Sequence, residues 1–434
     1  MTDLYRAHLD TLMHRYQATL ERCGFDAVVV SAGVAEKVRD DDHAYPYHAG
    51  AFAQQWLPEA ITPGTCLVIR PGEKPQLFWP AQADFWHITP TAPSGDWTKH
   101  WQLHAADHND WLATLPGRLA WVGPTLPALQ NTTATVEINP AKLRSDLAFD
   151  RACKTDFEVE QLWLASVKAV PGHHAARDAF LAGASEAEIY AAFLGASQQL
   201  ESQEPYPGII ALNEGAATLH YERRQFTRPT QHRSLLIDAG AQVGGYASDI
   251  TRTHGQGSAL FDELLAAMEG FEQQLCAAVR PGVPMAELHQ QAVVGVAGIL
   301  KDLDLCRLNV EEQLQRQVPQ AFFPHGLGHL LGLQVHDAGG HQQDRAGTLA
   351  PSSTAPFLRL TRTLQPGMVL TIEPGLYLIP MLLDRLRAEQ GAAAGLNESA
   401  IAELQPWGGV RIEDNVVVTE SGMRNLTREA FAAA

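Results

Sequence analysis

The chain has 434 residues, of which 45% are hydrophobic and 19% charged, and its formal net charge at pH 7 is −17. This length exceeds that of a typical single domain and predicts two domains. The negative charge argues against nucleic acid, and against an anionic membrane surface, as the main partner. No uninterrupted apolar segment approaches the roughly 18 residues of a transmembrane helix, and the amphipathic N-terminus lacks the apolar core of a signal peptide. We therefore expect no membrane partner and a cytoplasmic location.

The cysteines follow no functional pattern. Cys23, Cys66, Cys153, Cys276 and Cys306 are odd in number, widely spaced and never part of a CxxC pair. This spacing predicts neither a disulfide framework nor a zinc–thiolate site. We expect free thiols, most of them buried.

The first third of the chain alternates between helix and strand patterns. Residues 5–22 carry apolar side chains at helical spacing and are followed by Gly24. Short apolar runs predict strands at 27–30, 65–69, 76–79 and 119–122. This alternation predicts a small α/β domain, which we place at residues 1–152. Its one unusual segment, DDHAYPY at 41–47, is typical of a surface turn when taken alone.

The pattern changes at Lys154, where the second predicted part of the chain begins. Thr155 or Asp156 is expected to cap a helix, which should kink or break at Pro171. Ser185 opens a capping box and a helix to about residue 200. The remaining pattern predicts strands at 208–212, 368–372 and 410–418, a hairpin at 235–252, and helices at 261–279, 285–303 and within 381–405.

The hairpin at 235–252 contains two aspartates, Asp238 and Asp249. Gly244 and Gly245 permit a tight reversal from a strand at 235–237 to a second strand at 246–251, which would bring both carboxylates to one end of a sheet. Two such carboxylates repel each other and need a cation or a shared proton. On these residues alone, a turn-forming Asp238 and a solvated Asp249 are the simpler interpretation.

Histidines and glutamates further along the chain favour a metal site over this simpler interpretation. The segment FFPHGLGHLLGLQVHD places His325, His329 and His336 in a glycine-rich turn, where three structural histidines are an equally good explanation. Glu373 and Glu413 each lie in an apolar, strand-like run, where an inward carboxylate is costly unless it is paired, protonated or bound to metal.

Together, two aspartates, two glutamates and one histidine, with no cysteine, form a hard, oxygen-rich ligand set. Such a set favours Mn²⁺ and accepts Co²⁺ or Zn²⁺. Four carboxylates carry enough negative charge for two divalent ions, an arrangement that supports hydrolysis.

The order Asp238, Asp249, His329, Glu373 and Glu413, with the sequence around each, resembles the dinuclear pita-bread metallopeptidases, which include methionine aminopeptidase, aminopeptidase P and prolidase. The chain is most similar to the bacterial Xaa-Pro dipeptidases, whose relatives include an organophosphorus acid anhydrolase. The resemblance spans the chain through the segments DDHAYPY, PYPGIIALNEGAATLHY, LLIDAGAQVGGYASDITRT, PHGLGHLLGLQVHD, TIEPGLY and GGVRIEDNVVV.

This resemblance implies an α+β architecture, with a pita-bread catalytic domain at 153–434 after the smaller domain at 1–152. It implies a homodimer that hydrolyses small peptides, namely dipeptides with C-terminal proline, by a metal-bridged hydroxide. It also implies hydrolysis of organophosphate triesters as a promiscuous activity.

The resemblance assigns the metal ligands residue by residue. Two Mn²⁺ ions per subunit are implied, with Asp238 and Glu413 holding one, Asp249 and Glu413 bridging, and His329 and Glu373 completing the shell of the other. His220 and His336 are implied to contact the scissile carbonyl or its tetrahedral successor, and Glu373 to shuttle a proton to the leaving nitrogen.

Substrate-binding roles are also implied. Arg411 and His325 would lie near the substrate carboxylate, with Arg359 as a further candidate there, and Tyr206 would line the pocket. Asp42 would reach the site of a neighbouring subunit. The segment 47–50, in the implied trans-subunit loop, and Pro171, in the first catalytic-domain helix, depart from the family pattern.

Two other functions remain open. Aminopeptidase P shares the metal set and the proline preference but accepts longer peptides, and a cationic clamp on the substrate carboxylate would separate the two activities. Arg359 and Arg411 are candidates for this clamp, although Arg411 could equally orient Asp249 or Glu413. A metal-free binding module on the same fold is a third possibility, against which the presence of all five ligands argues.

Overall fold

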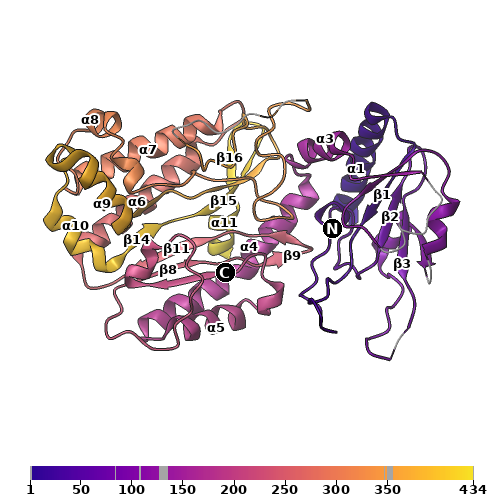
Figure 1. The fold of residues 1–434 in the computed structure, drawn as a ribbon, viewed down its shortest axis with the longest axis horizontal. Coiled ribbons are helices and arrows are strands. Elements are labelled where there is room, and N and C mark those ends of the chain that lie inside the picture. The colour runs from indigo at the N-terminus through magenta and orange to yellow at the C-terminus, as the bar shows by residue number, and fades with distance from the viewer. Residues whose placement is uncertain are drawn as a thin grey trace. The chain divides into compact units, whose positions relative to one another are not determined.

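The computed structural model describes residues 2–83, 85–106, 109–126, 135–346, 348 and 355–433. The chain divides into two compact units, Met1–Glu158 and Val159–Ala434 (Figure 1). The boundary expected after residue 152 lies in the short connection between helices α3 (Ala141–Arg151) and α4 (Asp156–Leu181).

The N-terminal unit is built on a six-stranded sheet with strand order β4-β3-β2-β1-β5-β6. Strand β1 lies at the centre and pairs antiparallel with β2 and parallel with β5. The elements are α1 (Thr2–Cys23), β1 (Ala27–Ser31), α2 (Ala51–Gln54), β2 (Cys66–Ile69), β3 (Gln76–Pro80), β4 (Gln102–Ala106), β5 (Leu119–Val122), β6 (Val136–Ile138) and α3. All four strands expected from the sequence are present, whereas β4 and β6 were not expected.

Alternation along β1 explains why this sheet is covered on both faces. Val28 and Val30 are buried in a cluster with Leu12 of α1, whereas Val29 is buried in a separate cluster with Trp121 of β5. Successive side chains of a strand point to opposite faces, so a continuous apolar run produces two cores.

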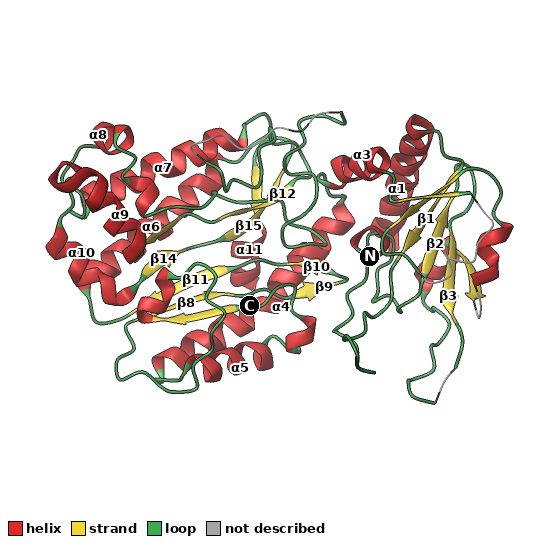
Figure 2. Cartoon of the chain, in the orientation of Figure 1, coloured by secondary structure: helices red, strands yellow, loops and turns green. Residues whose placement is uncertain are grey.

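The C-terminal unit combines small sheets with surrounding helices (Figure 2). Its sheets have the orders β11-β8-β7, β12-β15-β16, β10-β9 and β13-β14. The strands are β7 (Ile209–Leu212), β8 (Ser234–Asp238), β9 (Gln242–Val243), β10 (Tyr246–Ala247), β11 (Thr251–Gly255), β12 (Val369–Ile372), β13 (Gly375–Tyr377), β14 (Gly409–Arg411), β15 (Asp414–Val418) and β16 (Met423–Asn425).

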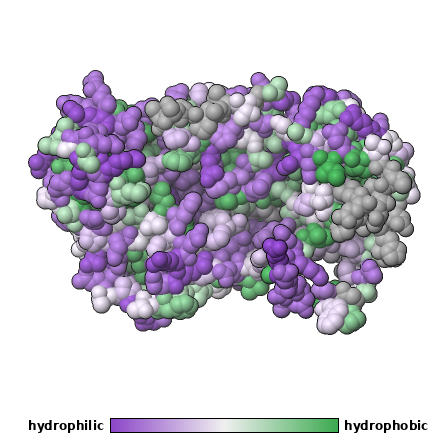
Figure 3. Space-filling view, in the orientation of Figure 1, coloured by the Kyte–Doolittle hydropathy of each residue, from purple (hydrophilic) through white to green (hydrophobic). Residues whose placement is uncertain are grey.

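The helices of this unit are α4, α5 (Glu186–Ala196), α6 (Ala259–Ala278), α7 (Met285–Asp302), α8 (Val310–Gln315), α9 (Pro380–Gln390), α10 (Glu398–Leu404) and α11 (Leu426–Ala433). Helix α5 packs against β7 and β8 through Phe193, Ile210 and Ile237, all fully buried. Among the described residues, no helix combines the length and the apolar character needed to cross a bilayer. Hydrophilic side chains cover most of the C-terminal unit that is visible in Figure 3.

Three local expectations need correction. The second strand expected at 246–251 is divided into β10 and β11, and Asp249 lies in the irregular segment between them. The strand expected at 410–418 is interrupted at Ile412 and Glu413, because Glu413 forms an isolated bridge with Thr251 instead of continuing a ladder. Helix α4 continues through Pro171 without a break.

The continuity of α4 has a packing explanation. A proline inside a helix costs about 3 kcal/mol because it removes a hydrogen bond and crowds the preceding turn. Ala169 and Ala176, on either side of Pro171, are both fully buried. Burial of both halves of the helix in the core therefore outweighs the local cost.

The cysteines are free thiols, as expected. Cys66, Cys276 and Cys306 are buried, and Cys23 and Cys153 are partly buried.

Candidate metal centre and active site

Most of the expected site residues line one cavity of the C-terminal unit, with a volume of about 660 Å³. Apolar and aromatic side chains, including Leu219 and Phe357, share the lining. Of the site residues expected from the sequence, those in the lining are His220, Asp238, Asp249, His325, His329, His336, Arg359, Glu373, Arg411 and Glu413. Segments far apart in the sequence therefore meet at one polar wall.

The pairing of β8 and β11 brings the two aspartates to the same end of a sheet. Asp238 is the last residue of β8 and pairs with Thr251, the first residue of β11. Asp249 precedes β11 by two positions and is 6% exposed. The sheet end expected from the sequence therefore exists, although the turn that builds it differs from a simple hairpin.

The His329 ring is oriented so that one nitrogen faces the carboxylates. Its Nδ1 lies 3.0 Å from the carbonyl oxygen of Leu330, which places the proton on Nδ1. Its Nε2 lies 3.3 Å from Oδ2 of Asp249 and 3.7 Å from Oε1 of Glu373. A backbone partner on one ring nitrogen is the usual way to present the other as a metal ligand.

Gly328 explains why this histidine segment cannot carry larger residues. A Cβ atom at this position would lie 2.0 Å from the backbone oxygen of Thr371. The glycine lets the segment lie directly against β12, and the backbone N–H of His329 donates to Oγ1 of Thr371 at 3.1 Å. The glycine-rich sequence thus serves close backbone approach and not helix formation.

Asp249, His329 and Glu413 present ligand atoms that all lie within 4.8 Å of one another, and all three residues are buried. Burial raises the pKa of Glu373 to about 7, and burial together with the neighbouring carboxylates raises the pKa of Glu413 well above its usual range. The pKa of Asp249 is instead lowered, despite its burial, by its contact with His329, so the carboxylates of this group differ in their affinity for protons. Oxygen donors plus one imidazole nitrogen fit hard or borderline divalent cations, so the donor set fits the expected metal.

Arg411 is buried, and it belongs to a chain of hydrogen bonds among residues that line or adjoin the cavity. Its Nη2 donates to Oδ2 of Asp238 at 2.7 Å, and its Nη1 donates to the hydroxyl of Tyr377 at 2.8 Å. That hydroxyl lies 2.9 Å from Nε2 of His325. Burial and the nearby Arg411 lower the pKa of His325 to about 3, so this imidazole is neutral.

His336, His220 and Arg359 also line the cavity. His336 packs edge-on against His329, with ring centroids 4.4 Å apart. Burial, together with the neighbouring His329 and Arg359, lowers the pKa of His336 to about 4. Arg359 is exposed within the lining, and its guanidinium forms no ion pair among the described residues.

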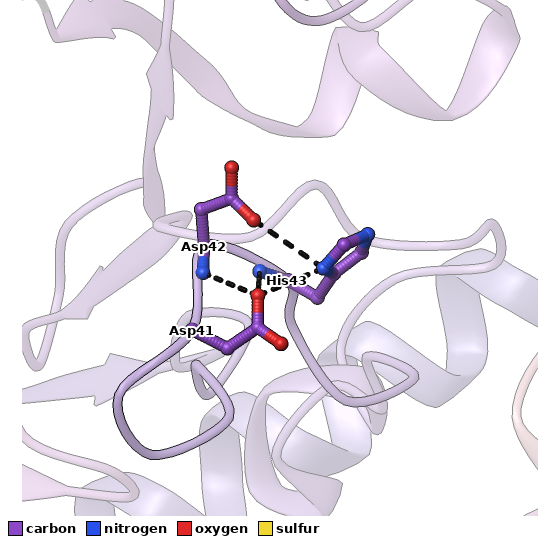
Figure 4. Close-up of side chains that lie close together, drawn as sticks. All are labelled: Asp41, Asp42 and His43. Carbon is purple, nitrogen blue, oxygen red and sulfur yellow. Dashed lines mark hydrogen bonds and ion pairs between the residues drawn. The ribbon is translucent and has the colours of Figure 1, made fainter.

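Two expected site residues lie outside this lining. The hydroxyl of Tyr206 donates to Oδ1 of Asp238 at 2.9 Å, which makes it a neighbour of the candidate metal centre. Asp42 belongs to the N-terminal unit, where Asp41, Asp42 and His43 form an exposed turn (Figure 4). Oδ1 of Asp41 accepts the backbone N–H groups of Asp42 and His43 at 2.7 and 3.1 Å, as in an ordinary Asx turn.

The structure adds functional neighbours that sequence reasoning did not identify: Thr251, Thr371, Tyr377 and Asn415. Each lies within two to four positions of an expected ligand, inside the segments SDITRT, TIEPGLY and RIEDN. The sequence did offer one indication of these neighbours. A hydroxyl or amide residue two positions from a ligand in extended chain lies on the same face as that ligand.

The sequence is similar to known proteins over nearly its whole length. Residues 160–420 match the model of metallopeptidase family M24, and residues 3–149 match that of the Xaa-Pro dipeptidase N-terminal domain. An Xaa-Pro dipeptidase of Stenotrophomonas maltophilia (strain K279a) is 43% identical over 437 residues, covering 99% of this chain and 98% of that protein. An Xaa-Pro dipeptidase of Xanthomonas campestris pv. campestris (strain B100) is 42% identical over 433 residues, with 99% and 98% coverage.

The fold is likewise found in solved structures. Aminopeptidase P from Escherichia coli, in its low-pH form, superposes with a TM-score of 0.72 at 25% identity and covers 96% of both chains. An aminopeptidase of Pseudomonas aeruginosa gives a TM-score of 0.71 at 22% identity and covers 97% of both chains. These likenesses confirm the expected pita-bread fold with its preceding domain, and the chain belongs to metallopeptidase family M24.

Proposed function

We propose that this protein is an Xaa-Pro dipeptidase that hydrolyses dipeptides with C-terminal proline. The observation that carries the proposal is one cavity lined both by the five expected metal ligands and by the cationic side chain of Arg359. The similarity to Xaa-Pro dipeptidases over the full chain, including their N-terminal domain, supports the same substrate class.

The proposed cofactor is a pair of Mn²⁺ ions per subunit, with Co²⁺ or Zn²⁺ as alternatives. Asp238, Asp249, His329, Glu373 and Glu413 would hold them. When bound, divalent ions polarise the peptide carbonyl and lower the pKa of a bound water molecule to near neutral.

The chain's own residues would position the substrate and move protons. His336 is neutral at pH 7 because its pKa is about 4, so its ring can donate a hydrogen bond to the carbonyl oxygen without bringing a charge. His220, at the same cavity, is proposed for the same oxygen. Glu373 is proposed to take a proton from the attacking water and deliver it to the leaving nitrogen.

Selection of dipeptides would come from Arg359. An X-Pro amide has no N–H, so proline is recognised by shape, and the free carboxylate is the charged feature that a dipeptide presents next to it. A longer peptide moves that carboxylate away from its cationic partner and leaves the cation unpaired. The same loss applies to a dipeptide amide.

The proposal includes a homodimer, in which Asp42 reaches the neighbouring subunit's site, and a cytoplasmic location. Light scattering of the purified protein tests the assembly. Replacement of Asp42 by Asn, assayed beside wild type at equal subunit concentration, tests the trans-subunit role.

A paired assay tests the activity itself. With added Mn²⁺, we expect hydrolysis of an X-Pro dipeptide and little hydrolysis of the matching X-Pro-Y tripeptide. Faster hydrolysis of the tripeptide would support the alternative, an Xaa-Pro aminopeptidase. Loss of both activities on chelation, with recovery on return of Mn²⁺, is the internal control.

A further inference from the structure

Two segments that carry metal ligands are tied together from both sides. On one side, the side-chain amide of Asn415 in β15 contacts the backbone of Asp249: Oδ1 accepts the Asp249 N–H at 3.0 Å, and Nδ2 donates to the Asp249 carbonyl oxygen. A single amide thus satisfies both backbone groups of a residue that lies in no strand.

On the other side, Arg252 in β11 contacts the backbone of the Glu413 segment. Its Nη1 donates to the carbonyl oxygens of Thr251 and Glu413, both at 2.8 Å. Its Nη2 donates to Oδ1 of Asp414 at 2.6 Å. The two contacts are reciprocal, since each segment sends one side chain to the backbone of the other.

Between these contacts, the segments touch at Thr251 and Glu413. The Glu413 N–H donates to the Thr251 carbonyl oxygen at 3.1 Å, and Oγ1 of Thr251 donates to Oε2 of Glu413 at 2.6 Å. We call Asn415, Arg252 and this bridge the ligand clamp.

The clamp is anchored away from the substrate cavity. Asn415 and Asp414 are fully buried, and the backbone N–H of Asn415 donates to Oγ1 of Thr427 in α11 at 2.9 Å. Neither Asn415 nor Arg252 is among the residues that line the 660 Å³ cavity. Their contacts act on the backbone of the ligands and not on substrate.

We propose that Asn415 and Arg252 are positioning residues that hold the carboxylates of Asp249 and Glu413 at a fixed separation before any metal binds. Two buried carboxylates repel each other, and a loosely held pair would separate in the metal-free protein. A clamp fixes their backbones, so metal binding does not have to restore the geometry. The inference rests on the proposed dinuclear function and names residues that act through the ligands.

Metal affinity is the direct readout. Asn415→Ala removes both contacts to Asp249, and we expect Mn²⁺ affinity measured by calorimetry to weaken by about 10- to 100-fold. At saturating Mn²⁺, kcat should remain lowered while KM for the dipeptide changes little, and the electron paramagnetic resonance signal of the Mn²⁺ pair should change. Asn425→Ala is the matched control, because Asn425 contacts Asp414 at 2.8 Å but neither ligand backbone, and it should bind Mn²⁺ like wild type.

Wild-type Mn²⁺ affinity in a folded Asn415→Ala variant would overturn the proposal. Arg252→Lys, which keeps the charge beside Asp414 but loses the forked contact, provides a second variant with the same expected direction. Hydrogen exchange of metal-free wild type requires no variant: we expect the peptide containing Asp249 to be protected, and rapid exchange there would also overturn the proposal. Normal Mn²⁺ binding without dipeptide hydrolysis would instead contradict the proposed function alone.

Discussion

Arg411 donates from Nη2 to Oδ2 of Asp238 across 2.7 Å, and its guanidinium is buried. The sequence left two roles open for Arg411: a clamp on the substrate carboxylate, or a partner that orients Asp249 or Glu413. The observed contacts support an orienting role, but toward Asp238. With Arg411 engaged in this way, Arg359 is the stronger candidate for reading the substrate carboxylate.

Substitution of the two arginines should therefore have different signatures. In Arg359→Ala, kcat/KM for an X-Pro dipeptide should fall by one to two decades, because a charge-assisted hydrogen bond contributes about 1.5–3 kcal/mol. The matching dipeptide amide should be unaffected. Arg411→Ala should lower the rates for acid and amide alike, since it leaves Asp238 without its partner. Equal losses on both substrates in Arg359→Ala would place the carboxylate contact elsewhere.

Asp249→Asn tests the metal centre. It removes one negative charge from the buried group formed with His329 and Glu413, and we expect kcat to fall more than about 100-fold with reduced bound metal. Circular dichroism should be unchanged, because the side chain keeps its shape. Asp262→Asn, at an exposed position of the same unit, is the control. Full turnover by Asp249→Asn would rule out the dinuclear mechanism.

Metal should also stabilise the fold. Binding to the native state alone at 100 times Kd contributes about 2.7 kcal/mol per site, which corresponds to a Tm increase of about 5–10 °C for a domain of this size. Differential scanning fluorimetry of chelated protein with increasing Mn²⁺ measures the shift. We expect no comparable shift in Asp249→Asn. If the Tm of the wild-type protein did not change on addition of Mn²⁺, metal binding at this site would be contradicted.

Glu204 makes stability depend on pH. Burial raises the pKa of Glu204 to about 7, whereas a glutamate in an unfolded chain titrates near 4.3. The folded protein keeps a proton that the unfolded chain releases, so this contribution is complete below about pH 4 and is lost as the pH rises through 7. At about 1.4 kcal/mol per pKa unit, the loss is at most about 4 kcal/mol.

We therefore expect Tm to fall more steeply between pH 5 and pH 7.5 in wild type than in Glu204→Gln. Glu214→Gln, at an exposed glutamate, should follow the wild-type curve. Parallel curves for wild type and Glu204→Gln would show that Glu204 does not carry this dependence.

The segments that carry the candidate ligands, which the structure brings to one cavity, could be identified from sequence because each is short. A carboxylate within an apolar run, or a histidine in a glycine-rich turn, indicates a site from its immediate sequence neighbours alone. The strands at 27–30 and 119–122 were equally accessible because their apolar runs are continuous. Strands β4 and β6 were missed because QLHAA and VEI expose most of their side chains and lack that pattern.

The sequence does not reveal contacts between residues that are far apart along the chain. The bridge between Thr251 and Glu413 interrupts the expected strand at 410–418, and nothing in that strand's own sequence signals it. The same holds for the contact between Arg411 and Asp238 and for the hydroxyl of Tyr377 beside His325. Tertiary packing, and not local propensity, decides these features.

The ligand clamp also sets when the metal centre can arise during synthesis. Asn415 and Asp249 are 166 positions apart, and the clamp contacts between the two segments join the middle of the chain to its last strands. Contacts of such separation form late in folding because long loops must close first. Since a chain emerges from the ribosome with its N-terminal part first, the site cannot assemble until nearly the whole protein has been made. Loading with metal is therefore a step that follows translation.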